Sequence, residues 1–395
     1  MNRIFIGFKA ANLAKTAIIA IGVWFLVFGT VAQAQLEFTT KAKFAILMDY
    51  ESGTVLFQKN ADQSMEPASM AKLMTLAVVF RQLQSGRFTM EDEFFISETA
   101  WREGGAGSGG STMFAVLNSK ISIENLIRSV IIQSGNDASI ALAEGMAGSE
   151  DTFARIMNEV ASDIGLTGSN FTNATGLPDP QMYTTARDLA QLSRYLIREY
   201  PQYYSMFSEP SFEWNGINQR NRNTLLNDGI GVDGLKTGHT ESAGFGIAIS
   251  TNEGGRRLVA VLHGFETERD RAEEARKLIV WGSRAFEQVP AFANREAVGY
   301  ANVYGGEKPN VALIAEGKLS LYLPIGGRRC LSANIVYQAP ILPPVVEGDK
   351  LAELRVYCDD QLIQIAPLYA AEDVKAGSIY RRSFDALKEL ALGWI

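Results

Sequence analysis

The chain has 395 residues, with 37 lysines and arginines, 44 aspartates and glutamates, two cysteines and two histidines. This length indicates two or three domains. Hydrophobic residues make up 47% and charged residues 21%, which excludes a disordered or collagenous protein. A formal net charge of −7 provides no electrostatic reason to bind nucleic acid. Two histidines leave little room for a histidine-rich metal site, so we expect no metal or cofactor and, in a hydrolase, a base other than histidine.

Residues 1–34 have the order of a secretory signal peptide. Arg3, Lys9 and Lys15 are the only charged residues of this segment. An uncharged run precedes Ala32-Gln33-Ala34, a small-x-small cleavage site. Cleavage there would leave a mature protein with a charge of about −10 that works outside the cytosol. The alternative is an uncleaved membrane anchor, because the uncharged run is long enough to span a bilayer.

The pattern of apolar residues predicts a mixed α/β (α+β) domain over residues 35–290. A hairpin comes first, because two apolar runs flank the turn Glu51-Ser52-Gly53. A block of helices, two more strands and a last helix follow, so we expect the sheet to join distant parts of the chain. The expected strands are Phe44–Tyr50, Thr54–Gln58, Gly244–Ser250 and Leu258–Leu262, and the expected helices are Lys72–Leu83, Ile123–Gln133, Ala138–Ala147, Glu150–Ile164, Thr185–Glu199 and Arg269–Gln288.

Residues 291–376 have the short alternating apolar runs and the prolines of a small all-β domain. Cys330 and Cys358 both fall in this domain. In an oxidising compartment they form a disulfide or remain two buried thiols, and sequence leaves both open. The expected strands are 312–314, 319–323, 351–357 and 361–366.

Residues 377–395 form the predicted C-terminal helix. Apolar side chains recur at helical spacing from Tyr380 to Trp394, with charged residues elsewhere on the helix, so the helix is amphipathic. Docking on the protein's own β domain and lying in the plane of a membrane both fit this pattern. We favour the membrane anchor, because the chain ends there with several large apolar residues to cover.

Ser69-Met70-Ala71-Lys72 stands at the start of a predicted helix. Residues three apart lie on one helix face, so the Ser69 hydroxyl can meet the Lys72 amine. Serine is a weak nucleophile until a base removes its proton, and lysine is such a base when burial or cationic neighbours lower its pKa. Alone the motif is weakly specific, because an N-cap serine followed by a surface lysine has the same spacing.

Two further motifs strengthen this hypothesis. Ser134-Gly135-Asn136 interrupts two predicted helices, and Lys236-Thr237-Gly238 precedes a predicted strand. On a strand, Lys236 and Thr237 lie on opposite faces, and a glycine lets a ligand backbone approach closely. The three motifs in this order are the known signature of class A β-lactamases and penicillin-binding proteins.

The chain resembles the low-molecular-mass penicillin-binding proteins, the serine-type D-alanyl-D-alanine carboxypeptidases. The resemblance covers nearly the whole mature sequence, including Asn173–Leu177, Tyr183–Asp188 and Val232–Thr240 besides the first two motifs. It implies a transpeptidase-like catalytic domain, a β domain as a stalk and a peripheral inner-membrane anchor. It also implies a periplasmic enzyme of peptidoglycan biosynthesis and cell shape.

The resemblance implies a mechanism for three catalytic residues. Ser69 attacks the carbonyl carbon between the two D-alanines of a peptidoglycan stem pentapeptide, and Lys72 takes its proton. Ser134 passes a proton to the leaving D-alanine, and water then hydrolyses the acyl-enzyme. β-Lactam antibiotics acylate the same serine.

The resemblance also implies a set of substrate-binding residues. Asn136 bonds the peptide, and the backbone N–H groups of Ser69 and His239 form the oxyanion hole. Lys236 supports Ser134. The terminal carboxylate of the substrate faces Thr237 and two arginines, for which ordinary surface salt bridges are the alternative. The implied set is Asn136, Lys236, Thr237, Gly238, His239, Arg222 and Arg271.

Residues 104–110 are rich in glycine and form either a mobile loop or a loop that borders the active site. Four other functions stay open: a class A-like β-lactamase, a D,D-endopeptidase, a transpeptidase and a non-catalytic wall-binding protein. No E-x-x-L-N motif of class A β-lactamases occurs in the sequence. The β domain and the anchor argue against an endopeptidase, and the intact motifs argue against a pure binding protein. The sequence does not indicate an oligomeric state.

Overall fold

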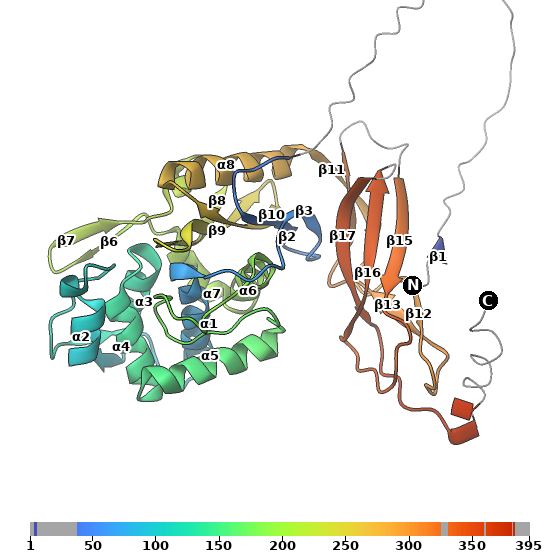
Figure 1. Ribbon diagram of the computed structural model, residues 1–395, viewed down its shortest axis with the longest axis horizontal. Coiled ribbons are helices and arrows are strands. Elements are labelled where there is room, and N and C mark those ends of the chain that lie inside the picture. Colours follow the sequence, from blue (N-terminus) through green and yellow to red (C-terminus); the bar gives the residue numbers. More distant parts are fainter. Residues whose placement is uncertain (1–3, 6–37, 325–330, 359–360, 381, 384–395) are drawn as a thin grey trace, which may run out of the picture.

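The computed structural model describes residues 4–5, 38–324, 331–358, 361–380 and 382–383. Figure 1 shows two bodies side by side, a mixed α/β domain and a β domain. Most of the predicted signal peptide and of the terminal helix, together with Cys330, lies outside these residues. Within the part of the chain that is described, no helix has the length and apolar character needed to cross a bilayer.

Five antiparallel strands form the centre of the larger domain, and their sheet continues into β17 (Gln361–Ala370) of the β domain, where Ile365 pairs with Val55. The strand order brings the N-terminal hairpin beside strands from the end of the domain, which confirms that the sheet joins distant parts of the chain. In spatial order the strands are β3 (Val55–Lys59), β2 (Phe44–Asp49), β10 (Arg256–Phe265), β9 (Gly244–Glu253) and β8 (Val232–Thr240).

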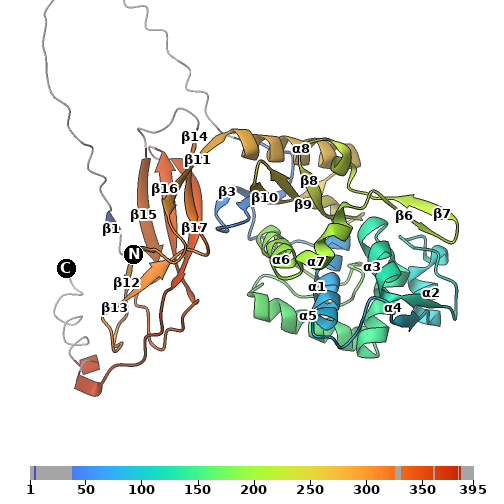
Figure 2. The same ribbon diagram turned by 180° about the vertical axis from the view of Figure 1, so that it is seen from behind.

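Each face of this sheet has its own core, because successive strand residues point to opposite faces. On β2, Ile46 and Met48 pack into the core beneath the helical block. Ala45 and Leu47 pack into the second core with Leu278 of the last helix. Figures 1 and 2 show this last helix, α8 (Glu268–Arg284), lying over the sheet on the side away from the helical block.

The helical block carries the first two motifs. Its larger helices are α1 (Lys72–Gln84), α3 (Ile123–Ile132), α4 (Asn136–Ala147), α5 (Glu150–Ile164) and α6 (Ala186–Glu199). Shorter elements surround them: η1 (Ala68–Ala71), β4 (Glu93–Phe95), α2 (Glu98–Gly104), η2 (Ala106–Ser108), β5 (Lys120–Ser122), α7 (Pro201–Tyr204), η3 (Ser205–Ser208), β6 (Ser211–Trp214), β7 (Ile217–Arg220) and η4 (Thr224–Asn227).

Capping residues explain several helix boundaries. Side chains of Ser122, Ser149 and Thr185 accept hydrogen bonds from the first turns of α3, α5 and α6. Thr267 does the same for α8. The prediction that this helix runs to Gln288 is wrong, because the chain turns at Ala285 into a strand that pairs with the β domain.

The β domain has a separate apolar core. The predicted strands are confirmed with small changes of their bounds, and the structure adds three that were not predicted, β11, β12 and β15. Ile4–Phe5 (β1), within the predicted signal peptide, pairs with β15. The strands are β11 (Phe286–Phe292), β12 (Ala297–Asn302), β13 (Asn310–Ile314), β14 (Leu319–Pro324), β15 (Leu331–Tyr337), β16 (Lys350–Cys358) and β17 (Gln361–Ala370).

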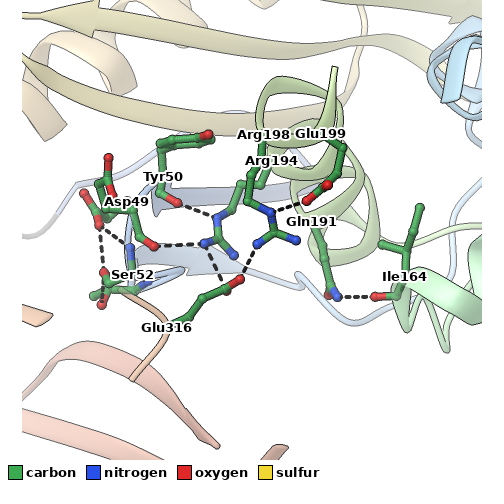
Figure 3. A network of polar contacts seen from close by, with 11 residues as sticks. Asp49, Tyr50, Ser52, Ile164, Gln191, Arg194, Arg198, Glu199 and Glu316 are labelled. Atoms are coloured by element: carbon green, nitrogen blue, oxygen red, sulfur yellow. Dashed lines mark hydrogen bonds and ion pairs between the residues drawn. The ribbon is translucent and has the colours of Figure 1, made fainter. Parts of the chain in front are cut away.

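Polar contacts join the two domains. The hydroxyl of Tyr322 on β14 donates to the Asp49 carboxylate at 2.5 Å, and its ring packs in the second core of the larger domain. Glu316 of the β domain pairs with Arg194 and Arg198 of α6, as Figure 3 shows. A cavity of about 1030 Å³ lies beside these contacts, lined from both domains. The domain boundary expected after residue 290 lies inside β11.

Candidate active site

The nucleophile motif spans a short helix and the start of the next. Ser69 lies in η1 and Lys72 is the first residue of α1. The Lys72 amine lies 3.3 Å from the Ser69 hydroxyl oxygen, as the three-residue spacing predicts. Ala68, directly before the nucleophile, has the left-handed φ of +47°, so the chain makes a sharp turn that presents Ser69 at the surface of the site.

Lys72 is fully buried, and its exposed fraction is 0%. Its Nζ donates to Oδ1 of Asn136 at 2.8 Å and to the carbonyl oxygen of Thr175 at 2.5 Å. Burial and the nearby Arg222 charge lower the pKa of Lys72 to about 7, against the opposing effect of Asp137 and Glu150. A lysine with this pKa is neutral in a large fraction of molecules at neutral pH and serves as a base.

The second motif forms a tight turn in front of α4. Ser134 has the left-handed φ of +66° and is buried, and its hydroxyl has no hydrogen-bond partner within the described residues. Asn136, whose amide oxygen accepts from Lys72, occupies the position beside the base. The hydrogen bond that joins the first two motifs in the described structure therefore runs from Lys72 to Asn136.

Asp137 follows the second motif and holds the segment that borders it. Its carboxylate accepts from the Thr112 hydroxyl at 2.6 Å and from the backbone N–H groups of Met113 and Ala115. A buried carboxylate with several donors is a strong local anchor. Sequence reasoning did not single out Asp137.

The glycine-rich segment packs onto this turn. A Cβ on Gly104 would lie 2.2 Å from the backbone nitrogen of Asp137, and one on Gly110 would lie 2.8 Å from the Asn136 amide nitrogen. The backbone contact at Gly104 excludes a larger residue there. Because Gly104 and Gly110 both approach the second motif, the segment borders the site, which is one of the two alternatives that the sequence left open.

The third motif lies on β8, the edge strand of the sheet next to η1. Lys236, Thr237 and Gly238 are all buried. The Lys236 amine donates to the Thr237 carbonyl oxygen at 3.0 Å, and burial, followed by the charges of Lys72 and two arginines, lowers its pKa well below the usual value. A Cβ on Gly238 would be 3.2 Å from the Met70 nitrogen, so glycine permits the close approach of strand and nucleophile turn.

His239 follows the motif and is exposed, with its ring stacked on Phe245 at a centroid distance of 3.8 Å. Arg222 donates to the Ser111 hydroxyl at 2.7 Å, and Arg271 is buried with a hydrogen bond of 2.6 Å to Glu268. Both arginines therefore have partners, and Arg271 also reaches the Arg222 carbonyl at 3.4 Å. They add positive charge around Lys236.

A fourth segment, Asn173–Gly176, completes the surroundings of the base. The Asn173 side chain accepts from the backbone N–H groups of Thr175 and Gly176 at 3.1 and 2.8 Å. This turn presents the Thr175 carbonyl to Lys72. The sequence contained a signal for it, because an Asn followed three residues later by a Gly is typical of such a turn.

All three motifs lie within a region of the chain that matches one protein family. Residues 30–267 match the D-alanyl-D-alanine carboxypeptidase family, and residues 286–376 match the C-terminal domain of penicillin-binding protein 5. The chain belongs to the D-alanyl-D-alanine carboxypeptidase family. Among the described residues no cluster of three or more histidine, cysteine, aspartate or glutamate side chains is arranged to hold a metal ion.

Relatives of this family resemble the chain over most of its length. The D-alanyl-D-alanine carboxypeptidase DacD of Escherichia coli is 38% identical over 86% of this chain and 88% of its own. DacA of Haemophilus influenzae is 37% identical over 88% of each chain.

Solved structures resemble this chain over most or over part of its length. Penicillin binding protein 5 from Haemophilus influenzae covers 86% of this chain and 99% of its own, with a TM-score of 0.68 and 35% identity. Penicillin-binding protein D2 from Listeria monocytogenes, solved in an ampicillin-bound form, has a TM-score of 0.57 and 26% identity, and covers 63% of this chain and 99% of its own. The fold expected from the sequence is confirmed for both domains.

Proposed function

We propose that this protein is a serine-type D-alanyl-D-alanine carboxypeptidase that removes the terminal D-alanine from peptidoglycan stem pentapeptides through an acyl-serine intermediate. The family match and the relatives support this reaction. The observation that carries it is a fully buried lysine 3.3 Å from a partly exposed serine, with a pKa lowered to about 7.

In the first step Ser69 attacks the carbonyl carbon of the scissile peptide bond while Lys72 takes its proton. The amine has two hydrogen-bond acceptors, Asn136 and Thr175, besides the serine. A neutral amine has two N–H groups and one lone pair, so two bonded acceptors direct the lone pair toward Ser69. The backbone N–H groups of Ser69 and His239 receive the developing oxyanion, where one such donor typically contributes roughly 100–1000-fold in turnover.

In the second half of the reaction the leaving D-alanine takes a proton and water attacks the acyl-enzyme. The Ser134 hydroxyl has no hydrogen-bond partner in the part of the chain that the structure describes, which supports its role in relaying the proton to the substrate amine. Asn136 helps to orient the base as well as the bound peptide.

Positive charge at the far end of the site suits the free carboxylate of the substrate. Lys236 is buried at this end and lacks an acidic partner among its described hydrogen bonds. A substrate carboxylate would supply the missing counter-charge, and Thr237, Gly238, Arg222 and Arg271 line the same end.

Labelling with a fluorescent penicillin tests the nucleophile. The protein should form a covalent adduct that Ser69→Ala abolishes and that Ser85→Ala, at the exposed other end of α1, leaves intact. A label that survives Ser69→Ala would refute the acyl-serine mechanism. Release of D-alanine from a stem pentapeptide, compared with the rate of penicillin hydrolysis, then separates a carboxypeptidase from a β-lactamase.

Export and membrane attachment belong to the same proposal. The signal-like residues 1–34 and the amphipathic pattern of residues 377–395 support a periplasmic enzyme held peripherally at the inner membrane. Ile379 and Tyr380, which begin this segment, are 77% and 89% exposed. Deletion of residues 377–395 should move the protein to the soluble fraction. If the same share of the protein stayed with the membranes, the anchor hypothesis would be wrong. N-terminal sequencing that finds Met1 in the mature protein would refute cleavage of the signal peptide.

A further inference from the structure

Glu150 lies behind the base rather than in the site itself. It is the first residue of α5 and is half-buried. Its carboxylate accepts the backbone N–H of Ala174 at 2.9 Å. The carbonyl of Ala174 is bonded as well, because it accepts from the Thr75 hydroxyl at 2.8 Å. The next carbonyl along the chain, that of Thr175, is the one bonded to Lys72.

Helix α1 presents two donors to this segment. Lys72 and Thr75 are three residues apart and therefore share a helix face. They bond the consecutive carbonyls of Thr175 and Ala174, respectively. Glu150 supplies the contact from the opposite helix, so the segment is clamped between α1 and α5.

We propose that Glu150 is a positioning residue for acyl transfer, whose carboxylate fixes Ala174 so that the Thr175 carbonyl orients the Lys72 amine, and whose negative charge favours the protonated form of that amine. The inference rests on the proposed function, since it assigns Lys72 as the base. Neither the motifs nor the implied substrate contacts include Glu150.

The charges around the two groups set the direction of the effect. Lys72 faces the acids Asp137 and Glu150, which raise its pKa, and the cation Arg222, which lowers it. Lys236 also interacts with Lys72. Burial raises the pKa of Glu150, as do the nearby acids Glu103, Glu144 and Asp151, whereas the Ala174 N–H opposes this shift. The helix N-terminus favours the ionised carboxylate as well.

Two substitutions separate the clamp from the charge. Glu150→Gln keeps an oxygen acceptor for Ala174 but removes the negative charge. Glu150→Ala removes both. Glu159→Gln is the matched control, because Glu159 is an exposed acid on the same helix and is not among the charges that shift the pKa of Lys72 or of Glu150.

The measurement is the second-order rate constant of acylation by a fluorescent penicillin from pH 5 to 10, expressed per titrated site so that misfolded protein does not count. In wild type we expect this rate constant to rise with pH along an acid limb and to level off at a plateau. For Glu150→Gln we expect the plateau rate constant to stay within about twofold of wild type. The acid limb should move to lower pH by roughly half a unit or more, because the negative charge that favours the protonated amine is gone. For Glu150→Ala we expect the plateau to fall by about tenfold as well, because the base loses its orientation. Glu159→Gln should match the wild type.

Unchanged plateau and acid limb in both Glu150 variants would overturn the inference. So would an equal loss in both variants with an unmoved acid limb, since that result indicates a structural defect only. Failure of the proposed function looks different, because the wild-type protein itself would then form no adduct, or its adduct would survive Ser69→Ala.

Discussion

A lysine without solvent contact is costly, and the surroundings of Lys72 explain how the fold tolerates it. Its amine has three hydrogen-bond partners, and its low pKa removes much of the penalty for burying a charge. The same burial that costs stability produces the base. The structural and the catalytic requirements of Lys72 are therefore the same, namely a pocket without water and with oriented hydrogen-bond partners.

The acylation rate should depend on pH through this residue. Only the neutral amine takes a proton from Ser69, and the neutral fraction grows as pH rises through the pKa of about 7. We therefore expect the rate of penicillin acylation to rise about tenfold per pH unit below 7 and to level off above it. Lys72→Ala should lose roughly 100–10,000-fold and the pH dependence with it. Stopped-flow labelling measures both, and a normal rate in Lys72→Ala would contradict the assignment.

At the scale of elements, two turns approach each other so closely that one of them requires glycine. Ala68 turns the chain into the nucleophile helix η1, and Gly176 ends the turn that contacts Lys72. Gly176 has the left-handed φ of +74°, and a Cβ there would lie 2.0 Å from the Ala68 carbonyl oxygen. The turn is therefore fixed against the residue before the nucleophile.

Gly176→Ala should harm both stability and acylation. The left-handed conformation alone costs about 1–2 kcal/mol for alanine, and the clash with Ala68 adds to this and displaces Ser69. Gly148→Ala is the matched control, because Gly148 has a φ of +80° but nothing within 4 Å of its Cβ position. Thermal unfolding and acylation rates should show a loss of stability in both variants but a loss of acylation, by tenfold or more, only in Gly176→Ala. Equal acylation in the two variants would contradict a role for this contact.

At the scale of the whole molecule, the β domain is joined to the catalytic domain by specific side chains. Figure 3 shows Glu316 reaching toward Arg194 and Arg198, while Arg194 also donates to the carbonyls of Tyr50 and Glu51. The buried Tyr322–Asp49 bond supports the same junction. Such contacts set the direction in which the active site faces relative to the β domain.

Glu316→Ala should loosen this junction with little loss of stability. Its ion pairs are partly exposed, so we expect the free energy of unfolding to fall by at most about 1 kcal/mol. Small-angle scattering or a pair of spin labels should show a broader distribution of interdomain distances. Glu353→Ala is the control, because Glu353 lines the same cavity but pairs with Arg355 inside the β domain. A distribution that stays as narrow as in the control would show that Glu316 does not hold the domains.

Local sequence patterns were sufficient to predict the longer helices. Helical periodicity predicted these helices to within a few residues, and the structure shows caps such as Ser149 and Thr185 at their ends. Periodicity and capping both act within one or two turns of the chain. The end of α8 was misplaced, since its apolar pattern continues into β11 and the strand is stabilised by pairing with β14. Pairing partners that lie far along the chain leave no local signal.

In the candidate site, too, some features follow from local sequence and others from contacts between distant segments. The three motifs and the contact of Ser69 with Lys72 follow from the sequence alone, because residues three apart meet on any helix. The way in which the base is held depends on packing between distant segments. Asn136 and Thr175 lie 64 and 103 residues from Lys72, and Glu150 acts through yet another segment. The pKa of Lys72 depends on burial and on these distant groups, which are brought together by packing.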